Sequence, residues 1–177
     1  MRKTIVLVGS SSTGKSTVFE LLKNRLPNYQ FISESTRTVA KFGFPINEEG
    51  VDETQLAILA FHLKSLLTPG NLVLDRGLLD NLVYTENLKS VQRKTVEYIE
   101  DTFKQVADEY THIIYFPIEF LSVNDGVRSV NEEWRSQIDQ RFKYYLDKYY
   151  KDQYLTVTGS PMQRINQIIN YITNGTK

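Results

Sequence analysis

The segment of the sequence with the clearest chemistry is rich in glycine and serine and lies near the N-terminus. Residues 9–17 match the pattern G-x-x-x-x-G-K-[ST] in full. Glycines let a backbone turn bring several N–H groups to one phosphate at the start of a helix, where the helix dipole also favours anions. The lysine can reach the terminal phosphates of a nucleotide, and the serine after it can bind Mg²⁺. The sequence therefore predicts a nucleoside-triphosphate site formed by Gly9, Ser10, Ser11, Ser12, Thr13, Gly14, Lys15, Ser16 and Thr17.

A second group of charged residues follows the apolar stretch at residues 29–33. Glu34 comes directly after it, and Arg37 lies one helical turn further on. The carboxylate of Glu34 can accept the proton of an attacking hydroxyl or help to hold the water shell of a metal. The guanidinium of Arg37 can bind a phosphate through two hydrogen bonds. The alternative is an acid that favours a helix N-terminus and an arginine on the surface.

A third group closes the apolar stretch at residues 72–75, which ends on Asp75 and is followed by Arg76. An apolar strand that ends on aspartate is typical of a residue that orders Mg²⁺ close to the serine of a phosphate loop. Arg76 is expected to point into the acceptor side of the cleft, although a structural Asp75–Arg76 pair is the alternative. Asp80, one turn later, is either a partner of an arginine or an ordinary helix charge.

Alternating strand and helix patterns must position these residues. Helical stripes with a period of 3.6 separate the strand candidates, which predicts an α/β sandwich with right-handed crossovers. In such folds ligands bind at the carboxyl ends of the strands, where the charged groups above are found. One stripe predicts a helix with a leucine-rich core face, formed by Leu56, Leu59, Ala60, Leu63, Leu66 and Leu67. The strand candidates are Thr4–Val8, Tyr29–Ser33, Leu72–Asp75, Ile113–Phe116 and Tyr154–Val157.

Composition narrows the function further. The 177 residues carry 21 basic and 21 acidic side chains and no cysteine. Zero net charge does not favour a nucleic-acid or membrane partner, and the lack of cysteine excludes disulfides and thiolate metal sites. The apolar run after Met1 is too short for a secretory signal, so we expect a cytoplasmic protein with one domain over residues 1–177. His62 and His112 lack metal-ligand spacing and are expected to be structural.

Together these motifs resemble the AAA-like P-loop kinase family, which includes ribosylnicotinamide kinase domains and is similar to deoxynucleoside and thymidylate kinases. The resemblance implies a three-layer α/β P-loop kinase fold with a five-stranded parallel sheet in the order 2-3-1-4-5 and a short lid. It also implies ATP and Mg²⁺ as cofactors and a small nucleoside or nucleotide as acceptor. It is carried by residues 9–17, 34–37, 75–84, 125–128 and 159–161.

The same resemblance assigns roles to residues that the motifs alone leave open. A lid over roughly residues 117–135 would bring Arg128 and Arg135 to the transferred phosphoryl group, whereas helix-surface arginines are the alternative. Gly159 and Pro161 would border the adenine, although ordinary turn and capping chemistry explains them equally well. Gln55 would place its amide against the acceptor, and an exposed glutamine is the alternative.

The sequence leaves the acceptor chemistry open. A hydroxyl acceptor needs a base, which Glu34 or Asp75 could supply, and a phosphate acceptor needs cations, which Arg37 and Arg76 could supply. A kinase of hydroxyls on nucleic acid and a non-kinase P-loop regulator are the alternatives. The sequence lacks the guanine motif Asn-Lys-x-Asp, and its length does not accommodate an AAA core with a helical lid domain. The oligomeric state, including a homodimer, stays open.

Overall fold

Apolar segments form the strands of a parallel sheet in the computed structural model, which describes residues 2–122 and 131–174. The five-stranded sheet formed by these residues has the order β2-β3-β1-β4-β5, as the family resemblance implied. All four pairings are parallel, with Ile5 in register with both Val73 and His112 at the centre. The strands are β1 (Thr4–Val8), β2 (Tyr29–Ile32), β3 (Asn71–Asp75), β4 (His112–Tyr115) and β5 (Tyr154–Thr156).

The predicted strand limits differ from these by one residue at most. The prediction for β1 is confirmed, whereas β2 and β5 end one residue earlier, β3 begins one earlier, and β4 is displaced by one. Backbone pairing does continue past the ends of the strands, because the N–H of Phe116 donates to Val8 O at 3.0 Å and that of Val157 to Tyr115 O at 3.0 Å. Limits that differ by a residue are therefore a matter of where regular pairing stops.

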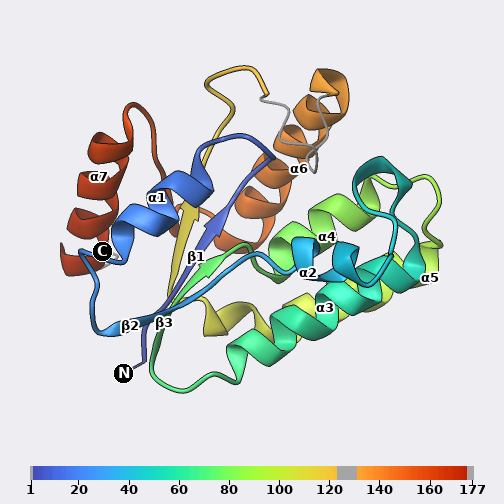
Figure 1. Cartoon of the computed structure of the whole chain (residues 1–177), viewed down its shortest axis with the longest axis horizontal. Coiled ribbons are helices and arrows are strands. Elements are labelled where there is room, and N and C mark those ends of the chain that lie inside the picture. Colours follow the sequence, from blue (N-terminus) through green and yellow to red (C-terminus); the bar gives the residue numbers. More distant parts are fainter. Residues whose placement is uncertain (1, 123–130, 175–177) are drawn as a thin grey trace.

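Helices cover both faces of the sheet (Figure 1). One face carries α1 and α7, and the opposite face carries α3 to α6. The helices are α1 (Lys15–Leu22), α2 (Thr36–Lys41), α3 (Asp52–Leu66), α4 (Leu78–Glu86), α5 (Arg93–Val106), α6 (Glu132–Tyr150) and α7 (Pro161–Asn174), with short 3₁₀ turns η1 (Asn47–Glu49) and η2 (Ala107–Glu109).

The two cores follow from the alternation of side chains along each strand. Ile5 and Leu7 of β1 point to the face covered by α1 and α7, where they join Phe19 and Ile168. Val6 and Val8 point to the opposite face, which packs against α4, α5 and α6. Because strands with apolar residues on both faces must be covered on both, the continuous apolar runs in the sequence correctly indicated a buried parallel sheet.

The leucine-rich core face predicted for residues 56–67 is wrong in part. Leu56 and Leu67 are 40% and 82% exposed. The buried face of α3 is turned by about one residue. It combines the apolar Ile58, Leu59 and Leu66 with the polar Thr54, Gln55 and His62. The reason is that this face borders a pocket as well as the core, so hydrophobicity alone does not mark it.

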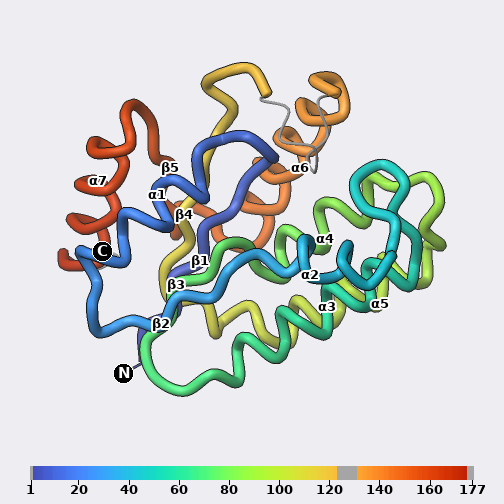
Figure 2. The backbone as a smooth tube through the Cα atoms, in the orientation of Figure 1, coloured from blue at the N-terminus to red at the C-terminus, as the bar shows by residue number. Residues whose placement is uncertain are grey.

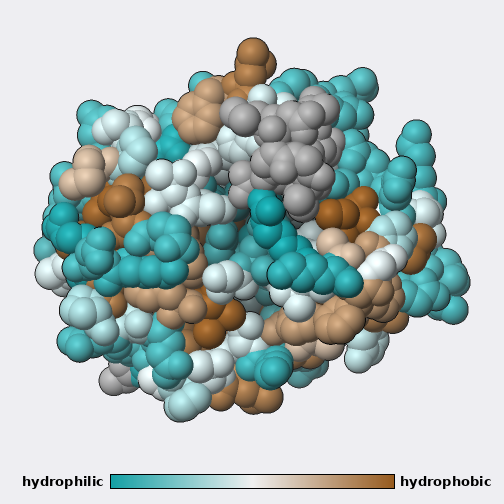
Figure 3. Space-filling view, viewed as in Figure 1, coloured by the Kyte–Doolittle hydropathy of each residue, from teal (hydrophilic) through white to brown (hydrophobic). Residues whose placement is uncertain are grey.

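The fold brings the loops after β1, β2 and β3 to one edge of the sheet. Figure 2 shows the chain leaving β1 in a wide turn before it enters α1. On the face shown in Figure 3, apolar residues form several small areas separated by hydrophilic ones. Within residues 2–122 and 131–174, every helix is too short or too polar to cross a membrane.

Candidate functional site

The phosphate loop between β1 and α1 has the backbone conformation that the glycine pattern predicts. Gly9 and Gly14 have φ values of 138° and 86°, which favour glycine. A Cβ on Gly9 would lie 2.5 Å from the carbonyl oxygen of Phe116, so no larger residue fits there. Ser12 also adopts a positive φ, 54°, in a region that non-glycine residues rarely visit. Left-handed residues in such a loop help to turn successive N–H groups into an anion-binding concavity.

Lys15 begins α1 and lies inside this loop. Its Nζ donates to Gly9 O at 2.8 Å, to Ser10 O, and to Thr13 Oγ1 at 3.0 Å. The side chain is buried, and burial together with the nearby charge of Arg76 lowers the pKa of Lys15 to about 7. The predicted phosphate-binding lysine is thus held at the loop itself, in an environment that an added anion would make more favourable for its charge.

Ser16 and Asp75, the two residues predicted from the sequence to bind Mg²⁺, are in contact at the edge of the loop. Ser16 Oγ donates to Asp75 Oδ2 at 3.2 Å, and the buried Asp75 Oδ1 has no hydrogen-bond partner among the described residues. Burial raises the pKa of the Asp75 carboxyl, which a cation would reverse. Because Mg²⁺ is held by few protein oxygens together with substrate phosphates, a hydroxyl and an unpaired carboxylate oxygen fit this ion.

No larger metal cluster accompanies this pair in the described parts of the chain. Residues 2–122 and 131–174 contain no group of three or more metal-ligating His, Asp or Glu side chains. The Ser16–Asp75 pair matches the sparser ligation of a nucleotide-bound cation.

The other end of the site is organised around Arg76, which follows β3. Arg76 has a positive φ of 79° and is 8% exposed. Its Nε lies 2.9 Å from Glu34 Oε1, and its Nη1 lies 3.1 Å from Asp80 Oδ1. The guanidinium also lies 5.0 Å from the centre of the Tyr84 ring. Of the alternatives for Asp80, the structure selects the partner of an arginine, and burial raises the pKa of this carboxyl to about 6.

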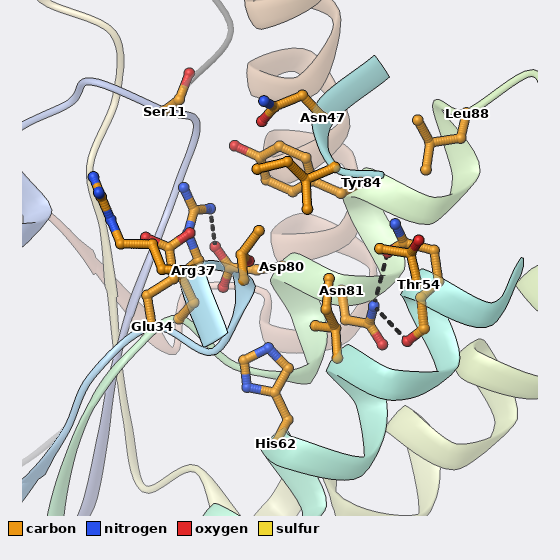
Figure 4. Close-up of a pocket in the computed structure, with 15 residues that line it drawn as sticks. Ser11, Glu34, Arg37, Asn47, Thr54, His62, Asp80, Asn81, Tyr84 and Leu88 are labelled. Atoms are coloured by element: carbon orange, nitrogen blue, oxygen red, sulfur yellow. Dashed lines mark hydrogen bonds and ion pairs between the residues drawn. The ribbon is translucent and has the colours of Figure 1, made fainter. Parts of the chain in front are cut away.

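Two hollows meet at the Glu34–Arg76 pair. The smaller, of about 290 Å³, is bordered by residues 12–17 and Asp75, and the larger has about 680 Å³; both volumes include space open to solvent. Glu34 and Arg76 line both. Figure 4 shows Glu34 and Arg37 on one side of the larger hollow and Thr54 and Asn81 on the other. A phosphate chain in the first hollow would therefore end beside a ligand in the second.

Amides and hydroxyls form the far wall of the larger hollow, where α3 faces α4. Gln55 is 4% exposed, so the alternative of an exposed glutamine is wrong. Asn81 Nδ2 donates to Gln55 O at 3.3 Å and to Gln55 Oε1 at 3.1 Å, and Thr85 Oγ1 donates to the same Oε1 at 3.1 Å. Asn81 Oδ1 is buried without a hydrogen-bond partner among the described residues. This wall offers a polar ligand unsatisfied hydrogen-bonding capacity.

Of the predicted lid and base-binding residues, the structure describes Arg135, Gly159 and Pro161. Arg135 is fully buried, and its guanidinium donates to loop carbonyls, so contact with a transferred phosphoryl group stays a prediction. Arg128 lies outside the described residues. Gly159 has a φ of 90°, and its N–H donates to Glu119, while Pro161 begins α7. Their predicted contact with adenine is likewise untested.

A family model described as "AAA domain" matches residues 4–164 of the sequence. The chain belongs to this AAA domain family. No curated protein matches the sequence.

Solved structures extend this assignment to the fold. The AAA domain aligns with NadR protein in complex with NR at a TM-score of 0.80 and 20% identity, over 99% of this chain and 53% of that one. It aligns with deoxyadenosine kinase from M. mycoides at a TM-score of 0.75 and 18% identity, over 97% and 98% of the two chains. It aligns with thymidylate kinase from Candida albicans at a TM-score of 0.71 and 15% identity, over 98% of this chain and 92% of that one. The chain spans about half the length of the NadR structure and has the α/β P-loop kinase fold.

Two side chains of this AAA domain, those of His62 and Arg164, lie at or beside the site although the sequence did not assign them to it. His62, interpreted from sequence as structural, lines the larger hollow with Asn81 and Tyr84. Arg164 donates from Nη1 to Thr13 O at 2.6 Å on the outer side of the phosphate loop. A signal for Arg164 was present, because it shares the four-residue spacing of Ile168 and Ile172 and so places a charge on an apolar helix face.

Proposed function

We propose that this protein is an ATP-dependent kinase that transfers the γ-phosphoryl group of Mg·ATP to a hydroxyl of a small nucleoside-type acceptor. The observation that carries this proposal is the junction of the two hollows at the Glu34–Arg76 pair. A phosphate-binding loop on one side and a polar hollow on the other are the two compartments that phosphoryl transfer requires. Deoxyadenosine kinase and thymidylate kinase share the fold, which supports the same reaction class.

Charge balance favours a hydroxyl over a phosphate as the acceptor group. The charged residues that line the larger hollow are two carboxylates and two guanidiniums, those of Glu34, Asp80, Arg37 and Arg76. Arg76 is already in contact with both acids, at 2.9 and 3.1 Å. A phosphate acceptor would need cations that are not offset by carboxylates, because its charge must be desolvated in the cleft. A neutral hydroxyl meets no such cost.

Position separates the two candidate bases. Glu34 lines both hollows and is 15% exposed, whereas Asp75 lines only the phosphate side and accepts a hydrogen bond from Ser16. We assign Asp75 and Ser16 to Mg²⁺, which when bound supplies positive charge against the phosphates. Glu34 is then the base that accepts the acceptor's proton.

The reaction follows from these roles. Lys15 and the loop N–H groups hold the β- and γ-phosphates, and the acceptor hydroxyl lies between Glu34 and the γ-phosphorus. A bond forms from the acceptor oxygen to phosphorus while the bond to the β-phosphate oxygen breaks. The hydroxyl proton passes to the Glu34 carboxylate, and ADP leaves with the electron pair of the broken bond. The protein contributes chiefly positioning and electrostatic stabilisation.

A panel of acceptors in matched pairs tests this proposal. Formation of ADP from Mg·ATP is measured with each nucleoside and its 5′-monophosphate, and with nicotinamide riboside and its mononucleotide. We expect turnover that depends on a nucleoside and is absent with the matched monophosphate. Turnover with monophosphates alone would contradict the hydroxyl assignment. ATP hydrolysis that no acceptor changes would favour a P-loop regulator, and salt-sensitive retention on DNA would favour a nucleic-acid kinase.

A further inference from the structure

Two buried arginines donate hydrogen bonds to the side of the phosphate loop that faces away from the smaller hollow. Arg135 of α6 donates from Nε to Ser11 O at 2.9 Å and from Nη2 to Ser12 O at 3.2 Å. Arg164 of α7 donates from Nη1 to Thr13 O at 2.6 Å. The carbonyls of residues 11, 12 and 13 are thus bound in succession by guanidiniums from two different helices.

These contacts fix the direction of the loop N–H groups. The described residues contain no cis peptide, and in a trans peptide the C=O and the following N–H point in opposite directions. Carbonyls turned toward the arginines therefore turn the N–H groups of Ser12, Thr13 and Gly14 away from them. These same three residues border the smaller hollow, so their N–H groups face the proposed phosphates.

Arg135 also holds a strained conformation. Ser12 has a φ of 54°, which is costly for a residue with a Cβ and persists only where the surroundings determine it. Arg135 binds the carbonyls immediately before and after this residue's Cα, so one planar guanidinium spans the strained peptides. A fork of parallel N–H donors suits this task better than a single ammonium.

Both guanidiniums are buried and have further partners. Arg135 is 0% exposed and Arg164 is 2% exposed. Arg135 Nη1 donates to Glu132 Oε2 at 2.8 Å, and Arg164 Nη2 is paired with Glu119. Arg164 also lies 5.4 and 5.5 Å from the centres of the Phe120 and Phe116 rings. Because the acids and rings fix the arginines, the arginines can fix the loop.

We infer that Arg135 and Arg164 are positioning residues that hold the phosphate loop in its anion-binding shape without contacting the nucleotide base or the acceptor. The inference rests on the proposed function, in which this loop binds Mg·ATP. It differs from the lid role expected for Arg135, since a lid arginine acts on the phosphoryl group during transfer. The polyphosphate part of the donor is what these residues would help the protein to bind.

Calorimetry with Mg·ATP and with Mg·tripolyphosphate, which has no base, tests this inference. We expect Arg164→Met to weaken both ligands by the same factor, about tenfold, the loss of one charge-assisted hydrogen bond. Arg135→Met removes two such bonds and is expected to weaken both by more. Arg164→Lys should recover most of the affinity, because one ammonium can reach one carbonyl, whereas Arg135→Lys should recover little. The KM for the acceptor should stay unchanged.

The control is Arg141→Met, since Arg141 lies on the same helix as Arg135, is 43% exposed and pairs with Glu86 away from the loop. It should leave both affinities unchanged. Unchanged affinities in all Arg135 and Arg164 variants would overturn the inference. A loss of affinity for Mg·ATP alone would also overturn it, because that loss indicates contact with the base. A fall in kcat alone would overturn it too, because it indicates a lid role. If the methionine variants do not fold, the Arg135→Lys and Arg164→Lys variants test the inference by the same criteria. A wild-type protein that binds neither ligand would instead refute the proposed function.

Discussion

The two ends of the site are built in different ways. The phosphate end is one continuous stretch, residues 9–17, and in the proposed reaction it acts through backbone N–H groups and a single lysine. The acceptor end is assembled from side chains that follow β2, line α3 and follow β3 into α4, residues as far apart as Glu34 and Tyr84. Backbone groups bind any polyphosphate, whereas side chains select one ligand. The comparison teaches that changes at the first end should abolish turnover of every substrate, and changes at the second should alter turnover selectively.

The largest expected effect is at the phosphate end. Lys15→Ala should lower phosphoryl transfer by about 10³-fold, because it removes the cation that meets charge developing on the γ-phosphate. Every acceptor should be affected alike. The fold should remain, since the buried ammonium is replaced by an apolar group and its pKa of about 7 shows that burial disfavours its charge.

Steady-state rates and thermal unfolding of the purified variant check this prediction. Lys23→Ala is the control, because Lys23 follows α1, is 43% exposed and forms its ion pair with Glu20 on the surface. A Lys15→Ala variant that loses activity with one acceptor and keeps it with another would contradict the claim that the phosphate end serves every acceptor alike.

The second effect separates the ends from each other. Glu34→Gln should lower kcat by about 10²-fold with a hydroxyl acceptor, because the base is lost, while the affinity for Mg·ATP stays within about twofold. Glu97→Gln, on an exposed residue paired with Arg93, is the control. Rapid-quench measurement of product with the acceptor at saturation isolates the chemical step. An unchanged kcat would remove Glu34 as the base and reopen Asp75.

The difference between the ends also explains what could be predicted from the sequence. Residues 9–17 carry their function in their own spacing, and Glu34, Asp75 and Arg76 are marked by apolar strands that end in charge, so these positions were expected where the structure places them. The strand order followed from the family resemblance and is confirmed.

Helical residues of the acceptor end were harder to predict. The buried face of α3 is set by packing against α4 and by the hollow between them, so the leucine pattern did not identify which residues of the helix are buried. The Gln55–Asn81 bond joins residues 26 apart and needs the tertiary structure. A lid role is predicted for Arg135 from the sequence, whereas its contacts with the loop carbonyls are visible only in the tertiary structure.

A smaller effect would sharpen the description of the acceptor end. Gln55→Ala should raise the KM for the acceptor about tenfold and leave kcat and Mg·ATP affinity unchanged, because it removes one amide from the wall and leaves Asn81 and Thr85 without their shared partner. Leu56→Ala is the control on the same helix, with a side chain 40% exposed. Initial rates over a range of acceptor concentration give both constants. A rise in KM for Mg·ATP would instead indicate that Gln55 acts at the phosphate end.

The last effect is on stability rather than on catalysis and tests whether the acceptor end keeps His62 neutral. Burial and the charge of Arg76 lower the pKa of His62 to about 4, from 6.5 in the unfolded chain. As pH falls from about 6 to 4.5, the unfolded chain binds a proton that the folded protein does not, so His62 lowers the free energy of unfolding by about 1.4 kcal/mol per pH unit. Asp80, with its pKa raised to about 6, acts with the opposite sign in the same window.

Comparison with His62→Gln isolates the histidine from Asp80. The free energy of unfolding of wild type minus that of the variant, from urea titrations, should be flat between pH 7 and 8 and fall below pH 6 with the slope given above. A difference that stays constant to pH 4.5 would mean that His62 takes up its proton in the folded protein. The larger hollow would then carry an additional positive charge in mild acid, and the charge balance that favours a neutral hydroxyl acceptor would hold only at higher pH.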